Sequence, residues 1–407
     1  MYSSTACSIE RDSAQLVQVK KLNGHQIPFL IASDAMFGFA VGFSSPSIAP
    51  LIVALGVSIT FVGQAQTIGG LGATFLRLPV GAMMDRVGRK LFIILGGLIT
   101  LAGFISYSFA TYWLILGAGI TLTALDFAIR GTATSAALGD IASHGGVGKV
   151  FSLDLGVTET AATIAPLVGG YAATALSVSQ SGIFTISSGL IAVALFIILF
   201  GYHPVIAVKD DYPAKPWSIH PSRKLLPLLI VVAIDSFAWR ISFPFWTLYV
   251  FKQMAASTEQ LGVVIAISAG IPALTGLTLG SRLDKAGRIP FMVASEWSAI
   301  GAFLPLLFGW RPEFAYVSAV FWGLVYSLWV PALNAYVIDH FGRQNFGQTM
   351  GTLSLIAGIA SIASPLIGGW MWDNISPKLP FIVTLFFAIA NGFLIWFILE
   401  ERGAGMH

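Results

Sequence analysis

Apolar runs recur along the whole chain, and short charged or glycine- and proline-rich breaks separate them. A helix that crosses a bilayer needs about 20 predominantly apolar residues, and each run is long enough. The pattern predicts an all-α polytopic membrane protein with twelve transmembrane helices. These lie near residues 27–53, 60–84, 91–110, 112–139, 150–176, 182–202, 224–250, 260–281, 289–309, 314–338, 347–372 and 379–399.

One connection is long: residues 203–222 hold four prolines and several charged side chains. Such a stretch interrupts regular structure and divides the chain into two six-helix halves. The predicted organisation is a tail (1–26), an N-terminal six-helix bundle (27–202), a linker (203–222), a C-terminal six-helix bundle (223–399) and a second tail (400–407).

Composition supports the membrane interpretation and excludes several functions. The chain is 56% hydrophobic and 10% charged, whereas soluble domains have about 45–50% and about 25%. A dispersed net charge of +3 does not suit nucleic acid, which needs a clustered basic face. Cys7 is the single cysteine, and the sequence has no phosphate-binding loop, His-Glu-x-x-His motif or hydrolase triad. We therefore expect no enzyme activity, no cofactor and no metal.

Basic residues indicate the orientation. Of 22 Lys and Arg, 16 fall in the tails and in every second loop, and the opposite loops hold three: Lys252, Arg311 and Lys378. Basic residues near span ends stay on the cytoplasmic side. We expect a multi-pass protein of the cell membrane with both tails and the linker in the cytoplasm.

The two halves repeat each other. The stretch that contains Asp85 recurs around Asp284, and the same offset of 199 residues relates Pro166 to Pro365 in a Pro-x-x-Gly-Gly motif. A constant register over separate landmarks indicates internal duplication. In the first span of each half, Asp34 matches Asp235 at an offset of 201.

The repeated stretch resembles the signature of the major facilitator superfamily, Gly-x-x-x-Asp-Arg-x-Gly-Arg-Lys between spans 2 and 3. The resemblance implies two pseudo-symmetric bundles around a central cavity that opens alternately to each side. It also implies a cytoplasmic clasp that favours the outward-facing state, with topology-setting charges as the alternative. The expected clasp residues are Gly81, Asp85, Arg86, Arg89, Gly280, Asp284, Lys285 and Arg288.

Ionisable residues inside spans are costly, so they are functional candidates. Residue counts place Asp34, Arg130 and Glu159 at a similar depth, and Asp126 lies one turn from Arg130. Acids outnumber the arginine, so one carboxyl group could exchange a proton while another pairs with it; a fixed ion pair is the alternative. The candidates for proton coupling are Asp34, Asp126, Glu159 and Asp235.

Three further charged residues are expected to be structural. Asp154 is assigned to a cap or gate at the start of span 5, Glu296 to a peripheral helix 9, and Arg77 to the clasp.

An aromatic surface is expected in the C-terminal half, opposite the charged N-terminal cluster. It suits an amphipathic or aromatic substrate through stacking and cation–π contacts, although aromatic residues also anchor spans at the membrane interfaces. The candidate substrate-binding residues are Arg130, Arg240, Trp239, Phe243, Tyr326 and Trp329.

The sequence therefore predicts a monomeric proton-coupled secondary transporter of a small organic molecule, more specifically an exporter of hydrophobic or amphipathic compounds. One alternative is uptake or exchange of an organic anion held between Arg130 and Arg240. A membrane sensor is a third interpretation, which a large additional domain would favour. The expected partners are substrate, protons and the bilayer, and no nucleic acid.

Overall fold

The computed structural model describes residues 26–142, 147–203, 224–342 and 345–400, without the side chains of residues 78, 82, 85, 127, 142, 147–149 and 276–286. The expected linker and both tails fall largely outside these ranges. Each span of the N-terminal half is one helix, except that α5, a π-helical segment η1 and α6 together form the fourth. The elements are α2 (Ile27–Ala54), α3 (Ile59–Val87), α4 (Arg89–Ser108), α5 (Trp113–Asp126), η1 (Phe127–Gly131), α6 (Thr132–Ala142), α7 (Val147–Thr174) and α8 (Gln180–Gly201).

The C-terminal half repeats this order with two broken spans. Pro244 lies in the 3-10 segment η2 that joins α9 to α10, and Pro365 lies at the start of α15. Proline lacks the amide hydrogen that a continuous helix needs, so the breaks fall at these positions. The elements are α9 (Leu226–Ser242), η2 (Phe243–Phe245), α10 (Trp246–Gln253), α11 (Thr258–Ala286), α12 (Ile289–Phe308), α13 (Glu313–Phe341), α14 (Phe346–Ser361), α15 (Ser364–Asn374) and α16 (Leu379–Ile398).

Twelve membrane-length spans result within the described residues, as the apolar pattern predicts. Ten of them are long and apolar enough to cross a membrane by composition alone. The other two, α3 and α7, are more polar, and each packs against a helix of the other half: α3 against α15, and α7 against α11. Their polar side chains are therefore accommodated between the two halves.

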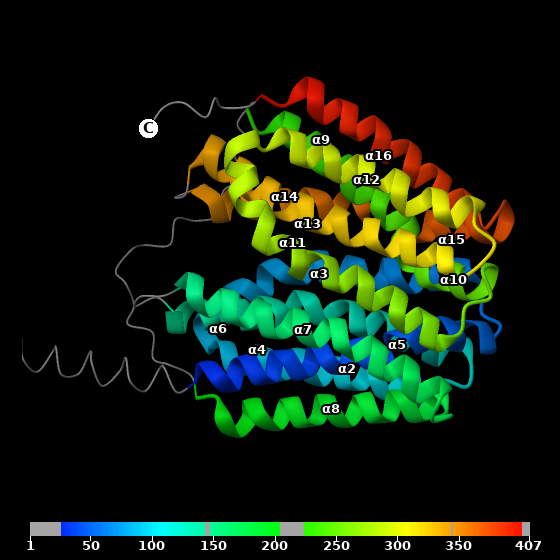
Figure 1. Cartoon of the computed structure of the whole chain (residues 1–407). Helices are drawn as coiled ribbons and strands as arrows, with labels where there is room; N and C mark the ends of the chain where they lie inside the picture. Colours follow the sequence, from blue (N-terminus) through cyan, green and yellow to red (C-terminus); the bar gives the residue numbers. More distant parts are fainter. Residues whose placement is uncertain (1–25, 143–146, 204–223, 343–344, 401–407) are drawn as a thin grey trace, which may run out of the picture.

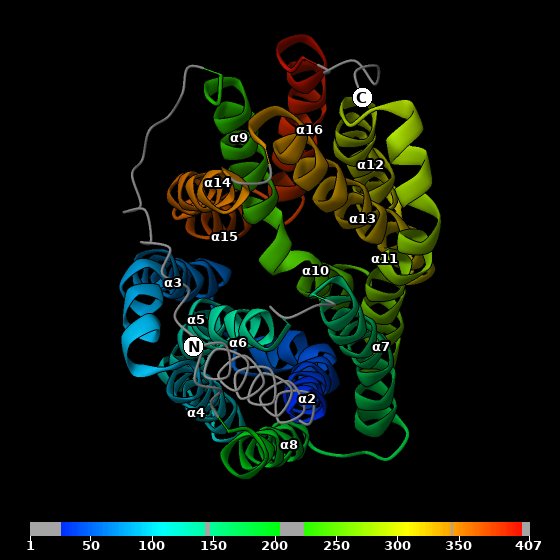
Figure 2. The same ribbon diagram turned by 90° about the vertical axis from the view of Figure 1, so that its left-hand side faces the viewer.

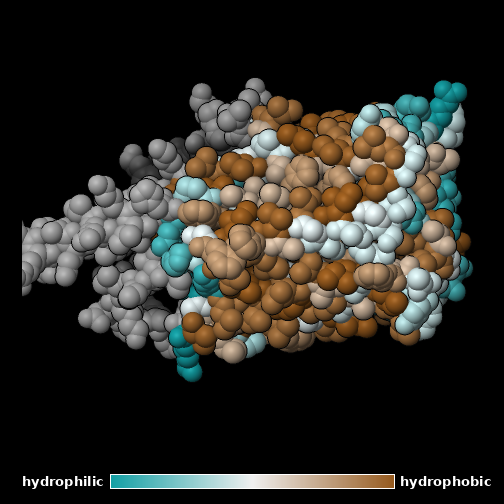
Figure 3. Space-filling model, turned by 90° about the horizontal axis from the view of Figure 1, so that it is seen from below, coloured by the Kyte–Doolittle hydropathy of each residue, from teal (hydrophilic) through white to brown (hydrophobic). Residues whose placement is uncertain are grey.

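The helices form two bundles that lie side by side, α2–α8 below and α9–α16 above (Figure 1). Seen end-on, α3 with α15 and α7 with α11 make the two seams between the bundles (Figure 2). The face seen from below carries a broad apolar belt with hydrophilic residues gathered at the two ends (Figure 3). This distribution fits a protein whose middle lies in the hydrocarbon core of a bilayer. We call the end with Arg86, Arg89 and Arg288 the basic end, and the other the far end.

The bundles are in close contact at the far end because glycines occupy the contact positions there. A Cβ atom added to Gly170 would lie 3.0 Å from the Cα of Glu259, and one added to Gly369 would lie 2.9 Å from the Cα of Thr60. Small residues let helices approach closely. Asp373 completes this seam by accepting hydrogen bonds of 2.7 Å from both the backbone nitrogen and the hydroxyl of Thr60.

The bundles separate towards the basic end. In the far half of α7, Pro166 and Gly170 lie against Gly262 and Glu259 of α11, whereas in the basic half Phe151, Leu153 and Leu155 are exposed. Every position from 151 to 160 is exposed or partly exposed, although Thr158 lies against Gly38 of α2, whereas the far half of α7 has buried positions. The structure is therefore closed at the far end and open at the basic end. The clasp was expected to favour the opposite state.

Candidate functional site

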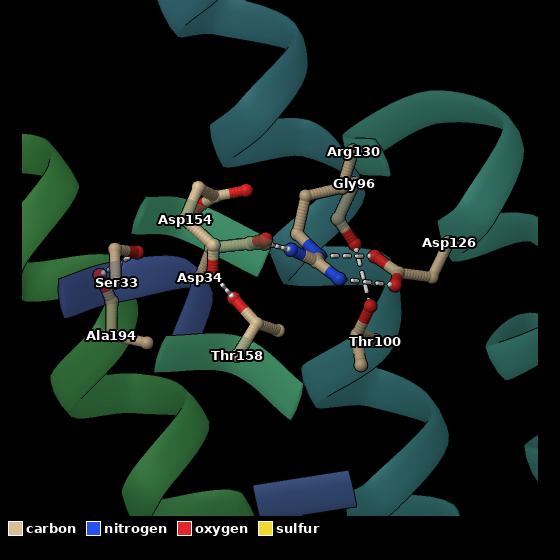
Figure 4. A network of polar contacts seen from close by, with 9 residues as sticks. All are labelled: Ser33, Asp34, Gly96, Thr100, Asp126, Arg130, Asp154, Thr158 and Ala194. Atoms are coloured by element: carbon tan, nitrogen blue, oxygen red, sulfur yellow. Dashed lines mark hydrogen bonds and ion pairs between the residues drawn. The ribbon is translucent and has the colours of Figure 1, made fainter. Parts of the chain in front are cut away.

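A partly buried charge network lies in the N-terminal bundle and joins two helices at Arg130 (Figure 4). The Arg130 guanidinium donates from Nε and Nη2 to the two carboxylate oxygens of Asp126, at 2.8 and 3.0 Å, and from Nη1 to Oδ1 of Asp34. The three side chains are 13–20% exposed. The network therefore places two acids on one base, and each nitrogen of the guanidinium donates to a carboxylate.

The local fold of span 4 holds Arg130 in place. Arg130 lies in the π-helical segment η1, and such segments often occur at functional sites because the extra residue redirects a side chain. A Cβ added to Gly96 of α4 would lie 2.6 Å from the backbone nitrogen of Arg130, so the close approach of these helices depends on glycine. The guanidinium carbon also lies 4.3 Å from the centre of the Phe37 ring, within cation–π range.

A third acid lies beside this network. Asp154 of α7 has both Asp34 and Arg130 as electrostatic neighbours, and its Oδ1 is buried without a hydrogen-bond partner. It lies well inside α7, so the expectation that it caps the helix is wrong. Thr158, one turn further, donates to the carbonyl of Asp154. Among the described residues around Arg130, negative charge exceeds positive charge if all three acids are ionised.

Glu159, expected at the depth of Arg130, faces the other bundle. It lies on α7 and is an electrostatic neighbour of Tyr326 on α13, so these two side chains oppose each other across the space between the bundles. Tyr326 is 58% exposed although it lies in the middle of its helix. Trp329, one turn further, instead packs against the apolar core of the C-terminal bundle.

The repeat partner of Asp34 has different surroundings. Asp235 of α9 lies beside the Glu296 carboxyl group of α12, and Asn391 of α16 donates to Glu296 Oε1 at 2.6 Å. Glu296 was expected on a peripheral helix, and to be structural for that reason, but its side chain is only 1% exposed. Its side chain points into the C-terminal bundle. The sequence indicates which helix carries this residue, but not the direction in which the side chain faces.

Aromatic rings line α9 and α13. Trp322 is the centre of the group: Trp239 and Trp246 lie 5.0 Å from it and Phe243 5.7 Å, measured between ring centres, and Phe303 lies 5.5 Å from Trp239. Phe243 is 62% exposed and presents its ring at mid-span. Trp322 was not among the residues predicted from the sequence. Its position one turn before Tyr326 and two turns before Trp329 was the signal that could have identified it.

The arginines Arg240 and Arg77 approach each other from different bundles. Arg240 of α9 is exposed, and its Nη1 lies 3.5 Å from where a Cβ of Gly70 on α3 would be. Arg77, also on α3, has Arg240 as an electrostatic neighbour. Arg77 was expected in the clasp at the basic end, but it lies beside the seam between the bundles. Arg130, by contrast, is bound by acids of its own bundle.

Among the described side chains, the clasp motif makes a matching ion pair in each bundle. Arg89 donates to Asp140 at 3.1 Å and Arg288 to Asp339 at 2.9 Å. Burial and the negative charge of Asp140 raise the pKa of the adjacent Tyr202 to about 12, so its hydroxyl stays protonated at neutral pH. Arg86 is exposed, and no described atom lies within 4 Å of a Cβ added to Gly81. Gly280 lies on α11, and the side chains of Asp85, Asp284 and Lys285 lie outside the described part of the structure.

The comparison with known families agrees with this architecture. The family model described as Major Facilitator Superfamily matches residues 30–226 and again 228–406. The chain therefore belongs to the Major Facilitator Superfamily, and it is a multi-pass membrane transporter and not an enzyme.

Individual relatives are distant. The multidrug resistance protein MdtG of Dickeya zeae (strain Ech586) is 22% identical over 250 residues, which are 59% of this chain and 60% of that protein, less than two thirds of its length. The proton-coupled antiporter flippase LtaA of Staphylococcus haemolyticus (strain JCSC1435) is 22% identical over 370 residues, 88% of each chain.

Solved structures share the fold at low identity. A mutant of the nucleoside transporter NupG has a TM-score of 0.77 and 13% identity, covering 94% of this chain and 100% of that chain. The human organic anion transporter MFSD10 has a TM-score of 0.64 and 13% identity, covering 92% and 99%.

Proposed function

We propose that this chain is a proton-coupled secondary transporter that exports a small hydrophobic or amphipathic organic compound from the cytoplasm. The printed names of two relatives, a multidrug resistance protein and a proton-coupled antiporter flippase, support this direction and this coupling. The exposed rings of Phe243 and Tyr326 supply apolar contact surface for such a compound, and Trp322, on which Phe243 packs, is itself buried in the core.

The charge network at Arg130 is the observation that carries the proposal. One guanidinium holds Asp34 and Asp126, and Asp154 lies beside them as a third acid. A single positive charge neutralises at most one of these acids fully, so protonation of another relieves the repulsion between them. Asp34 is the proposed proton carrier because it links α2 to the fourth span, and α2 contacts the other bundle at α10 and α11.

Alternating access gives the clasp motif its proposed role. The structure is closed at the far end by the glycine seam and by the Asp373–Thr60 bonds. In the other state, we propose that Asp85, Arg86 and Arg89 with their repeat partners Asp284, Lys285 and Arg288 close the basic end. The surplus of basic residues at that end supports its placement in the cytoplasm of the cell, and the protein would act there as a monomer.

Reconstitution into proteoliposomes tests the proposal. Because no substrate is identified, purified protein is first screened by thermal unfolding against lipophilic cations, neutral drugs and amphipathic anions, since a ligand that binds the folded state raises the unfolding temperature. Ethidium is the first transport probe. We expect a pH gradient to drive its movement, and an ionophore that dissipates the gradient to stop it. A screen with hits but transport that ignores the pH gradient would contradict proton coupling.

An organic anion is the second candidate substrate, favoured by the exposed Arg240 next to Arg77 at the seam between bundles. An exposed guanidinium can bind a carboxylate or phosphate at two points. The sequence suggested a clamp of Arg240 with Arg130, but all three nitrogens of Arg130 donate to acids of its own bundle. Arg240 is therefore the proposed anion-binding residue.

Substitution at Arg240 separates the two candidates. Arg240→Lys keeps the charge but loses the planar fork that binds a carboxylate or phosphate at two points. We expect it to weaken binding of an organic anion about tenfold or more, the equivalent of one charge-assisted hydrogen bond, and to leave a neutral compound unaffected. Anion affinity that survives both Arg240→Lys and Arg240→Ala would eliminate this candidate.

A further inference from the structure

Two carboxyl groups meet in the interior of the C-terminal bundle. Glu296 of α12 and Asp235 of α9 are electrostatic neighbours, and Glu296 also lies near the Trp239 indole. Glu296 and Asn391 are each 1% exposed, and Asn391 donates to Glu296 Oε1 at 2.6 Å. Three helices, α9, α12 and α16, therefore contribute to one buried polar group.

No positive charge balances this group among the described residues. The neighbours of Asp235 and Glu296 are each other, the Asn391 amide and the Trp239 indole, and none of these is a cation. On the α13 side, Ser295 donates to the Val325 carbonyl, and this contact adds no charge. Two ionised carboxylates side by side in a low-dielectric interior repel each other strongly, and such pairs retain a proton.

Two buried oxygens indicate where a hydrogen is missing. Glu296 Oε2 and Asn391 Oδ1 are both buried and have no hydrogen-bond partner among the described atoms. A buried acceptor without a donor loses its hydration and gains nothing in return, so it destabilises the fold. A proton on Glu296 Oε2 would make that atom a hydrogen-bond donor. The unsatisfied Glu296 Oε2 and the missing cation therefore have the same explanation.

We propose that Asp235 and Glu296 form a proton-binding site in the C-terminal bundle, in which the two carboxyl groups share one exchangeable proton and Asn391 fixes the position of Glu296. Binding forms one O–H bond on one carboxyl group, and release leaves two carboxylates and gives the proton to water. Asp235 keeps partial exposure, so it is the member through which the proton enters and leaves.

The location of the site gives it a consequence. Asp235 lies one turn before Trp239 and five residues before Arg240, on the helix that carries the aromatic surface and the exposed arginine. Loss of the shared proton places two negative charges between α9 and α12, and we expect this to push α9 away from α12. This link to transport rests on the proposed function, whereas the presence of the proton does not.

Infrared spectroscopy of the purified full chain, in vesicles of phosphatidylethanolamine and phosphatidylglycerol, tests the proposal without a substrate. A protonated carboxyl group has a carbonyl band that an ionised one lacks, and the band shifts in deuterium oxide when the proton exchanges. We expect the parent protein to keep such a band at about pH 7, where exposed carboxyl groups are ionised.

Variants assign the band. Glu296→Gln and Asp235→Asn each leave one acid without its acidic neighbour, so each should change the amplitude or the pH midpoint of the band. The double variant should lose the part of the band that comes from this pair. Glu313→Gln, which removes an exposed glutamate at the start of α13, is the matched control and should leave the band unchanged. Should Glu296→Gln fail to fold, the parent spectrum and Asp235→Asn alone still decide the question.

Two results overturn the proposal: absence of a protonated carboxyl band in the parent at neutral pH, or a band that the double variant retains in full. Its failure is distinct from failure of the proposed function. A shared proton at Asp235 and Glu296 in a protein whose transport ignores the pH gradient would leave this site standing and remove proton-driven export.

Discussion

The two bundles place an acid at matching points of their first spans, Asp34 in α2 and Asp235 in α9, but they surround it differently. Asp34 bonds to Arg130, which also holds Asp126. Asp235 lies beside a second acid, Glu296, with no cation among their described neighbours. One duplicated position therefore belongs to an ion network in one half and to a carboxyl pair in the other.

The repeat shows which substitutions produced this difference. At the offset of 199 residues, Arg130 corresponds to Trp329, and Gly97 corresponds to Glu296. At these two matching positions the N-terminal half has the cation and no acid in its third span, whereas the C-terminal half has the third-span acid and no cation. The difference teaches that a buried carboxylate is stabilised by one of two means, an arginine or a proton, and that the scaffold accommodates both.

Arg130→Ala breaks the comparison with the largest expected effect. It leaves Asp34 and Asp126 buried with no cation, and breaking a buried ion pair by removing one partner costs about 3–5 kcal/mol of folding free energy. We expect a markedly lower thermal unfolding midpoint in detergent and no transport. Arg311→Ala, which removes an exposed arginine of a far-end loop, is the control and should unfold like the parent. Parent-like stability of Arg130→Ala would mean that these acids already carry protons.

Asp34→Asn and Asp235→Asn together sharpen the comparison. If Asp34 is the proton carrier, Asp34→Asn should reduce pH-gradient-driven transport at least tenfold, about 1.4 kcal/mol in the driving interaction, while substrate exchange without a gradient continues. Asp235→Asn should retain gradient-driven transport with a changed number of protons per substrate. For both variants, transport is measured in proteoliposomes, and the number of protons per substrate is obtained from the pH gradient that just balances a known substrate gradient. Unchanged gradient-driven uptake in Asp34→Asn would move the assignment to Asp154 or Glu159.

The architecture could be predicted from the sequence because long apolar runs and a repeat with constant offset encode it directly. The partnership of Asp34, Asp126 and Arg130 also followed, since helical spacing relates two of them and residue counts give the depth of the third. The structure adds Asp154 to this group, because the depth count assigned Glu159 to it and could not say which face of α7 turns towards α2.

The C-terminal site could not be predicted in the same way. Glu296 and Asn391 come from α12 and α16, which contact each other only in the folded bundle. Neither belongs to a motif or a helical repeat. A single charged residue in a span indicates that a partner exists, but the direction of its side chain depends on helix rotation, which hydropathy along α12 does not specify. The closed far end likewise depends on packing at glycines and not on a charge pattern.

Gly96→Ala has an intermediate expected effect. It tests whether the close approach of α4 to Arg130 holds this arginine in place. The added Cβ would meet the backbone and Cβ of Arg130 at 2.6–2.9 Å, so α4 or the π-helical segment must move. Overpacking of this kind costs about 1–3 kcal/mol. Gly139→Ala in the fourth span is the matched control, because no atom lies within 4 Å of its added Cβ. There alanine should stabilise the helix by up to about 1 kcal/mol. Equal unfolding midpoints for the two variants would show that the close approach is not needed.

The smallest expected effect concerns the contacts in which the halves agree. Arg89–Asp140 and Arg288–Asp339 join corresponding residues at 3.1 and 2.9 Å, and both acids are about a third exposed. Exposed ion pairs contribute about 0.2–1 kcal/mol in double-mutant cycles. One double-mutant cycle combines Arg89→Gln with Asp140→Asn, and the other combines Arg288→Gln with Asp339→Asn. If the two halves differ only in the interiors of the bundles, the two cycles should give equal coupling energies within error. A coupling in one half several times larger than in the other would show that the asymmetry at Asp34 and Asp235 extends to the basic end, and would indicate that the clasp motif acts mainly through one bundle.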